Sequence, residues 1–160
     1  MRKVHLIYLA IFSMVAASCS VPKFAREVRQ TVNGSWTLTD ISYDQPGRYE
    51  TVLFNDADAK CFVGSDWFFR NNNSTGTYTI SSKNNCASGI RYIRWSVNEK
   101  EEGKAQLQFK LTDERKKDVS SGGYLLNISS LNSETMVLDH SVMVGGNPLK
   151  ISYTFKRTNS

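Results

Sequence analysis

Residues 105–112 read Ala-Gln-Leu-Gln-Phe-Lys-Leu-Thr, and every second side chain in this stretch is apolar. The apolar set is Leu107, Phe109 and Leu111, and glutamine or lysine lies between them. In an extended chain successive side chains point to opposite faces, so a period of two puts one set on a core and the other in water. The stretch therefore predicts a half-buried β-strand.

The same alternation continues on both sides of this stretch, for example at 93–97 and 151–155. Turn-forming runs such as Asp44-Gln45-Pro46-Gly47 separate the alternating segments. We find no helical period after Cys19, apart from one turn's worth at 56–61, so the chain is expected to be all-β. Short strands at even spacing are typical of a sandwich or an up-and-down barrel. We expect nine strands, at about residues 35–42, 49–54, 65–71, 76–82, 90–97, 105–112, 123–130, 134–143 and 149–157.

Length and charge narrow the class of protein further. The chain has 160 residues, of which 40% are hydrophobic and 11% aromatic, which suits one core rather than two domains. The net charge falls from +5 to +3 without Arg2 and Lys3, which we expect to be removed. Basic residues are scattered apart from Arg115-Lys116-Lys117, whereas nucleic-acid-binding domains carry a continuous basic stripe. We therefore expect no nucleic-acid partner.

The first nineteen residues have the layout of an export signal. A positive start, Met1-Arg2-Lys3, precedes a mostly apolar run at 4–17, and small residues lead into Cys19. This segment resembles a bacterial lipoprotein signal, although Ala16 stands where that pattern usually has leucine. The resemblance implies that residues 1–18 are removed and that acyl chains on Cys19 anchor the protein to a membrane. An ordinary signal peptide with an incidental cysteine is the alternative.

The residues after the anchor suggest where the protein resides. Residues 19–32 are mostly polar after the cysteine, and we interpret them as a lipid-anchored tether. Ser20 follows the anchor, and no aspartate is present there to indicate retention at the inner membrane. We therefore expect a bacterial envelope protein held at the outer membrane and facing the periplasm.

The start of the first expected strand, Gly34-Ser35-Trp36, resembles the Gly-x-Trp of the lipocalin pattern. Together with Asp66-Trp67-Phe68-Phe69 and Tyr153-Thr154-Phe155-Lys156-Arg157, it resembles the bacterial lipocalin-like lipoproteins. This resemblance implies an antiparallel up-and-down barrel of eight to nine strands over residues 33–158. It also implies a barrel floor in which Gly34 permits a sharp turn and Arg157 stacks on Trp36. In the alternative, Trp36 is ordinary core and Arg157 is solvated.

A barrel of eight strands can hold one small apolar molecule at its open end. Because the same aromatic side chains would also fill a solid core, a second hypothesis stays open: a non-catalytic structural or interaction lipoprotein that binds an envelope partner. We take as candidate ligand-binding residues the inward positions Tyr78, Tyr92, Trp95, Phe109, Leu111, His140 and Tyr153.

Three cysteines are present, Cys19, Cys61 and Cys86. If acylation uses the first, an even pair remains in an oxidising compartment, which predicts a Cys61–Cys86 disulfide. Two free thiols are the alternative. A zinc site with four Cys or His ligands is excluded, because His140 is the only histidine after the signal.

The sequence offers little material for catalysis. It has no Gly-x-Ser-x-Gly elbow, and His140 has no evident nucleophile to activate. Acidic residues cluster in expected turns, at 56, 58 and 99–102, rather than on inward strand positions where two carboxylates could meet. We therefore expect no enzyme activity, no cofactor and no metal site.

Overall fold

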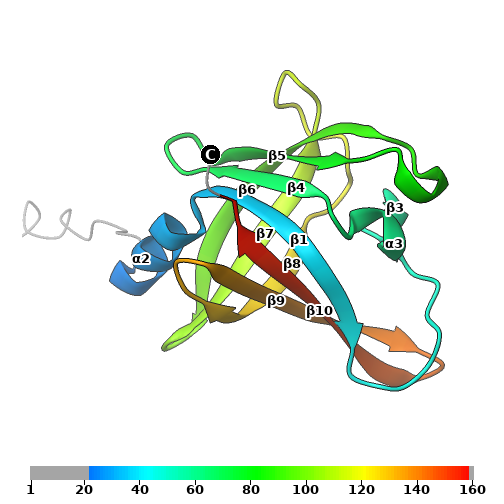
Figure 1. Ribbon diagram of the computed structural model, residues 1–160. Coiled ribbons are helices and arrows are strands. Elements are labelled where there is room, and N and C mark those ends of the chain that lie inside the picture. The colour runs from blue at the N-terminus through cyan, green and yellow to red at the C-terminus, as the bar shows by residue number, and fades with distance from the viewer. Residues whose placement is uncertain (1–21, 159–160) are drawn as a thin grey trace, which may run out of the picture.

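Eight antiparallel strands close into a barrel in the computed structural model, which describes residues 22–158. They follow one another around the barrel in the order β1-β10-β9-β8-β7-β6-β5-β4, as Figure 1 shows. The predicted all-β, up-and-down barrel is thereby confirmed. Its strands are β1 (Gly34–Tyr43), β4 (Asp66–Arg70), β5 (Thr75–Ile80), β6 (Gly89–Glu101), β7 (Lys104–Thr112), β8 (Tyr124–Leu131), β9 (Thr135–Val144) and β10 (Asn147–Arg157).

Strand β1 closes the barrel because it pairs with a strand on each side. Its Trp36 lies opposite Trp67 of β4 and opposite Arg157 of β10. Every other barrel strand pairs with the barrel strands next to it in sequence. Apolar side chains at alternate positions, such as Leu107 and Phe109 of β7, are buried inside. The core is therefore the barrel interior.

The expected strand at 49–54 does not join the barrel. Only β2 (Val52–Leu53) is extended, and it pairs with β3 (Ala57–Asp58) in a separate two-stranded sheet. The next two residues, Phe54 and Asn55, have φ angles of 53° and 49°, so the chain reverses there and the strand ends. The single helical turn expected at 56–61 is α3 (Ala59–Phe62), which begins later because residues 57–58 form β3, and η1 (Lys83–Asn85) lies between β5 and β6.

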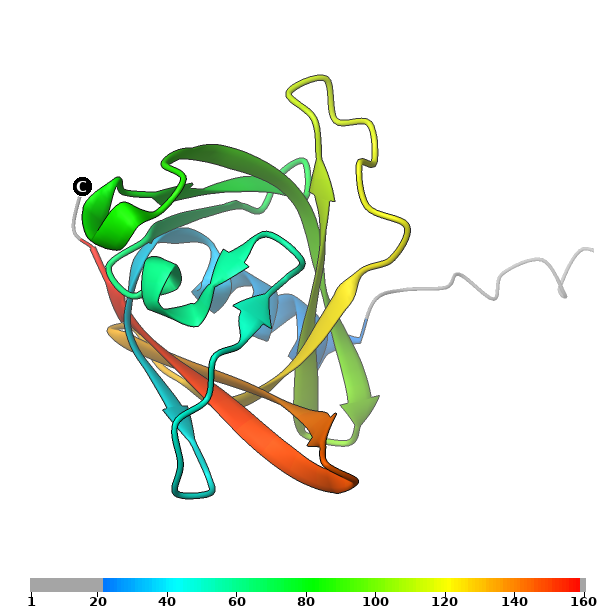
Figure 2. The same ribbon diagram turned by 90° about the vertical axis from the view of Figure 1, so that its right-hand side faces the viewer.

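The prediction of no helix after Cys19 is wrong, because α2 (Lys23–Val32) is a ten-residue α-helix. Ala25 and Val32 are buried in the core, and Phe24 and Val28 pack against it. Helix α2 covers one end of the barrel and turns these apolar residues toward it. The elements β2, β3 and α3 lie across the other end (Figure 2). The expected tether therefore contains a packed helix from residue 23 onward. Cys19 and residues 1–18 lie outside the described residues.

Candidate functional site

The end of the barrel next to α2 is closed by Trp36. Its side chain is fully buried, and its indole N–H donates a hydrogen bond of 2.8 Å to the carbonyl of Val32, the last helical residue. The guanidinium carbon of Arg157 lies 4.1 Å from the centre of a Trp36 ring. The structure thus places a cation over the aromatic face, the arrangement that favours cation–π attraction.

Arg157 also joins β10 to the end of α2 and to the turn between β8 and β9. Its guanidinium donates hydrogen bonds to the carbonyls of Thr31, Asn33 and Ser133. A cation at the C-terminal end of a helix satisfies carbonyls that have no partner within the helix. Gly34 makes room for it: φ is 121°, and a Cβ atom there would lie 2.7 Å from Arg157 Nη1. Trp36 and Arg157 together therefore close this end of the barrel.

Four of the candidate ligand-binding residues point into the barrel and are at most 2% exposed. The Tyr78 ring stacks on Trp67, with 4.5 Å between ring centroids. Burial is the main reason that the pKa of the Tyr78 hydroxyl is raised above its usual value, so this group remains a hydrogen-bond donor at neutral pH. The four residues are Tyr78, Trp95, Phe109 and Tyr153.

At the opposite end, which we call the barrel mouth, the ring of Phe54 packs against Phe109 and Tyr153 and is 7% exposed. Its centroid lies between 4.9 and 6.1 Å from five other ring centroids. Phe54 comes from a short segment, residues 52–58, which we call the plug segment. The five surrounding rings, which we call the ring cluster, belong to Phe62, Trp67, Phe109, Tyr124 and Tyr153.

Asp56 ties the plug segment to the wall of the barrel. Its carboxylate accepts hydrogen bonds from Arg91 Nε at 2.9 Å and from the Tyr78 hydroxyl at 2.8 Å. Arg91 Nη2 lies 3.2 Å from the second carboxylate oxygen, so the ion pair is bidentate. The side chains of Arg91 and Asp56 are 18% and 16% exposed, which places this pair largely out of water.

Neither Phe54 nor Arg91 is among the residues that the sequence predicts for the site. The inward insertion of Phe54 depends on the left-handed backbone at 54–55, which alternation does not reveal. Arg91 did give a signal, because it shares strand parity with the buried Ile93 and Trp95. A charge on the inward face of a strand indicates a partner inside, and that partner is Asp56.

A family model described as a lipocalin-like domain matches residues 32–138. The chain belongs to the lipocalin-like domain family. Among solved structures, it is similar to bovine odorant binding protein in complex with a selenium-containing odorant, with 12% identity and a TM-score of 0.44 over 88% of this chain and 76% of that chain. Bovine odorant binding protein with its natural ligand is similar at 12% identity and a TM-score of 0.41. The match covers 81% of this chain and 73% of that chain. No curated protein matches the chain.

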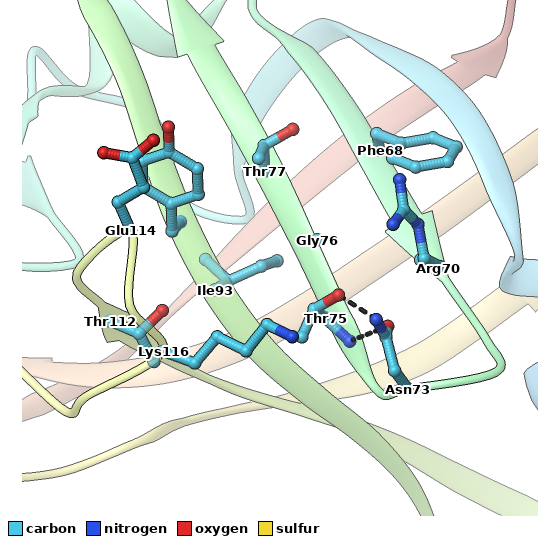
Figure 3. A pocket seen from close by; sticks show the side chains of 11 residues that line it. Phe68, Arg70, Asn73, Thr75, Gly76, Thr77, Ile93, Thr112, Glu114 and Lys116 are labelled. Carbon is cyan, nitrogen blue, oxygen red and sulfur yellow. Dashed lines mark hydrogen bonds between the residues drawn. The ribbon is translucent and has the colours of Figure 1, made fainter.

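Tyr92 does not line the interior of the lipocalin-like barrel, and its prediction as an inward residue is wrong. It lies opposite Thr77 and Thr112, one residue out of phase with the buried Ile93. With Thr77 and Thr112 it lines a pocket of about 200 Å³ on the outer wall of β4, β5 and β6, beneath the loop that follows β7. Figure 3 shows Phe68, Arg70, Glu114 and Lys116 around this pocket.

Two further candidates of the lipocalin-like barrel lie close to the mouth. Leu111 is half-buried and borders a cleft of about 400 Å³ at the rim, together with Asn55 and Tyr124. His140 is also half-buried, and its ring stacks on Tyr153 at 5.7 Å with an angle of 5° between the planes. His140 Nδ1 lies 3.2 Å from the Tyr153 hydroxyl.

Within residues 22–158 no cluster of three metal-ligating side chains is present, and no helix is long and apolar enough to span a membrane.

Burial lowers the pKa of His140 below its ordinary value of 6.5. Below about pH 6.5 the unfolded chain therefore binds more protons than the folded one, so stability should fall on acidification until the folded pKa is passed. A single site limits the slope to about 1.4 kcal/mol per pH unit. Urea unfolding at pH 5.5 and 7.5 should show a smaller loss in His140→Gln than in the wild type. If both proteins lost the same free energy of unfolding between pH 7.5 and 5.5, protonation of His140 would not be the cause of the loss.

The predicted disulfide is confirmed: Cys61 and Cys86 are bonded. The bond joins α3, which carries the buried Phe62, to the residue that follows η1. Phe62 packs edge-on against Phe54, with 5.3 Å between their centroids. One side of the ring cluster is thereby fixed to the connection between β5 and β6.

Proposed function

We propose that this protein is a non-catalytic binding protein of the bacterial envelope, and that its lipocalin-like barrel takes up a small apolar ligand in the place of the Phe54 ring. The observation that carries the proposal is the position of that ring. A side chain from a short segment outside the barrel sheet occupies a chamber made by five other rings. Concave, mostly aromatic chambers of this kind are typical of small-molecule sites.

Two features support an exchange between Phe54 and a ligand. First, the plug segment belongs to a separate sheet of two-residue strands, whereas four of the five rings of the ring cluster lie on barrel strands and the fifth, Phe62, lies on disulfide-linked α3. Second, the plug segment is held at the mouth by side-chain contacts rather than by pairing with a barrel strand. These contacts include those of Asp56 and a hydrogen bond of 2.6 Å from the Tyr124 hydroxyl to the Phe54 carbonyl. Segments outside the main sheet open at lower cost than the strands of a closed barrel do.

Phe54→Ala should create an apolar site about the size of a benzyl group. Dry cavities lined by apolar side chains bind benzene-like molecules, so the variant should bind toluene at least about tenfold more tightly than the wild type. Isothermal titration calorimetry in a sealed cell measures this. Val52→Ala is the matched control, since Val52 lies in the same segment and is 63% exposed; it should bind toluene as the wild type does.

A folded Phe54→Ala variant that binds no toluene would contradict ligand binding in the barrel. That result would favour the second candidate function, a structural or interaction lipoprotein with a solid barrel that binds an envelope partner. One observation already favours this alternative: Tyr78, Phe109 and Tyr153 are almost fully buried against other side chains with Phe54 in place. Circular dichroism of the variant shows whether it is still folded, so that a lack of binding is not caused by unfolding.

The lipid anchor and the outer-membrane location remain part of this proposal and rest on the sequence of residues 1–20. In a Gram-negative host, the full chain should incorporate an alkyne analogue of palmitate and sediment with outer membranes. Cys19→Ser should abolish the label. A label that persists in Cys19→Ser would contradict acylation at this cysteine.

A further inference from the structure

The plug segment places two different chemical groups in the barrel mouth at once. The ring of Phe54 lies in the ring cluster, and two residues later the carboxylate of Asp56 lies on Arg91 and Tyr78. Phe54 and Asp56 together therefore present an apolar body and one carboxylate. In outline this is an aryl- or alkyl-carboxylic acid in its ionised form.

The groups that hold the Asp56 carboxylate do not depend on Asp56 for their position. Arg91 Nη1 donates to the carbonyl of Gly89 at 2.9 Å, and Nη2 donates to the carbonyl of Ala87 at 3.0 Å. Tyr78 is fixed by its stacking on Trp67 in the core. When the plug segment leaves, a guanidinium and a phenol hydroxyl would remain at the edge of the ring cluster, and the N–H and O–H groups that now bond Asp56 would be free.

A ligand that only filled the apolar volume would leave Arg91 without an anionic partner. A charged group that is mostly buried is costly without a counter-charge, and removing one member of such a pair is strongly unfavourable. The carboxylate of Asp56 now meets Arg91 with both oxygens, at 2.9 and 3.2 Å, and the planar guanidinium is matched to a planar carboxylate. The replacement that conserves these contacts is another carboxylate.

We infer that the ligand of this barrel is an apolar monocarboxylate, bound with its tail in the ring cluster and its carboxylate on Arg91 and Tyr78, and that Phe54 and Asp56 occupy this site as a built-in mimic of the ligand. The inference rests on the proposed function and specifies its ligand class. Ligand and plug segment are then mutually exclusive, and binding displaces both side chains together.

The test compares 4-phenylbutyrate with 4-phenylbutan-1-ol, which differ only in the terminal group, by isothermal titration calorimetry at pH 7.5. In the Phe54→Ala/Asp56→Ala variant the carboxylate should bind at least about tenfold more tightly than the alcohol, as expected for a hydrogen-bonded charge. In Phe54→Ala alone this preference should be smaller, because a bound carboxylate must first displace Asp56 from Arg91. Adding Arg91→Gln to the double variant should abolish the preference and leave alcohol binding unchanged.

Arg94→Gln in the double variant is the matched control, because Arg94 lies on the same strand and is exposed; the preference should persist. Equal binding of the two compounds by the double variant would overturn the carboxylate inference while leaving apolar binding intact. Binding of neither compound by a folded double variant would overturn the proposed function as well. If the double variant does not fold, Phe54→Ala/Asp56→Asn removes the competing charge with a side chain of the same shape, and the same comparison decides.

Discussion

Replacing Trp36 by alanine is expected to lower the free energy of unfolding by about 4 kcal/mol, the usual cost of truncating a large buried aromatic side chain. Trp36 is fully buried between α2 and the barrel, so few neighbours can move to fill the space. The change also removes the partner of Arg157 and leaves the carbonyl of Val32 without its donor. Urea unfolding followed by circular dichroism measures the loss.

Two variants separate the contributions to this effect. Trp36→Phe keeps a ring beneath Arg157 but removes the N–H that bonds Val32, so it should cost about 1–2 kcal/mol. Phe68→Ala is the control for an aromatic residue on the outer wall, at 36% exposure, and should cost about 1 kcal/mol or less. If Trp36→Ala cost no more than Phe68→Ala, the packing of Trp36 at the closed end would not contribute measurably to the free energy of unfolding.

Much of this fold could be predicted from alternation alone, because every barrel strand has one face on the core. The pattern at 105–112 locates β7 to within one residue of its observed start. Helix α2 could not be found in this way: most of its ten residues are polar, and its apolar stripe is meaningful only against the barrel end that it covers. Its stability comes from tertiary packing, which a local pattern does not contain.

The site was less predictable than the fold, for reasons that differ between residues. Tyr78, Phe109 and Tyr153 point inward as their parity predicts, whereas Tyr92 was assigned inward against the parity of Trp95. Phe54 depends on a backbone reversal that only the folded surroundings impose. A charged residue with the parity of a buried strand face, such as Arg91, indicates a partner of opposite charge inside the barrel.

Removing the disulfide with Cys61→Ser/Cys86→Ser should lower the free energy of unfolding by about 3 kcal/mol. The two cysteines are 25 residues apart, and cross-linking a loop of that length restricts the unfolded chain by roughly this amount. Wild-type protein unfolded in urea with dithiothreitol should show the same loss, because the bond is then absent without any substitution. A loss below about 1 kcal/mol in both would mean that the unfolded chain is already compact around this loop.

The disulfide variant should also change the barrel mouth locally, because the bond holds α3 and therefore Phe62 against Phe54. Hydrogen exchange at residues 52–62 should accelerate more than the global loss of stability requires, while β9, which lies outside the bonded loop, should follow the global change. Uniform acceleration across both regions would show that the bond acts only through the unfolded state. Selective acceleration would show that the cross-link also keeps the plug segment closed, so that the same covalent bond contributes both to fold stability and to occupancy of the barrel by Phe54.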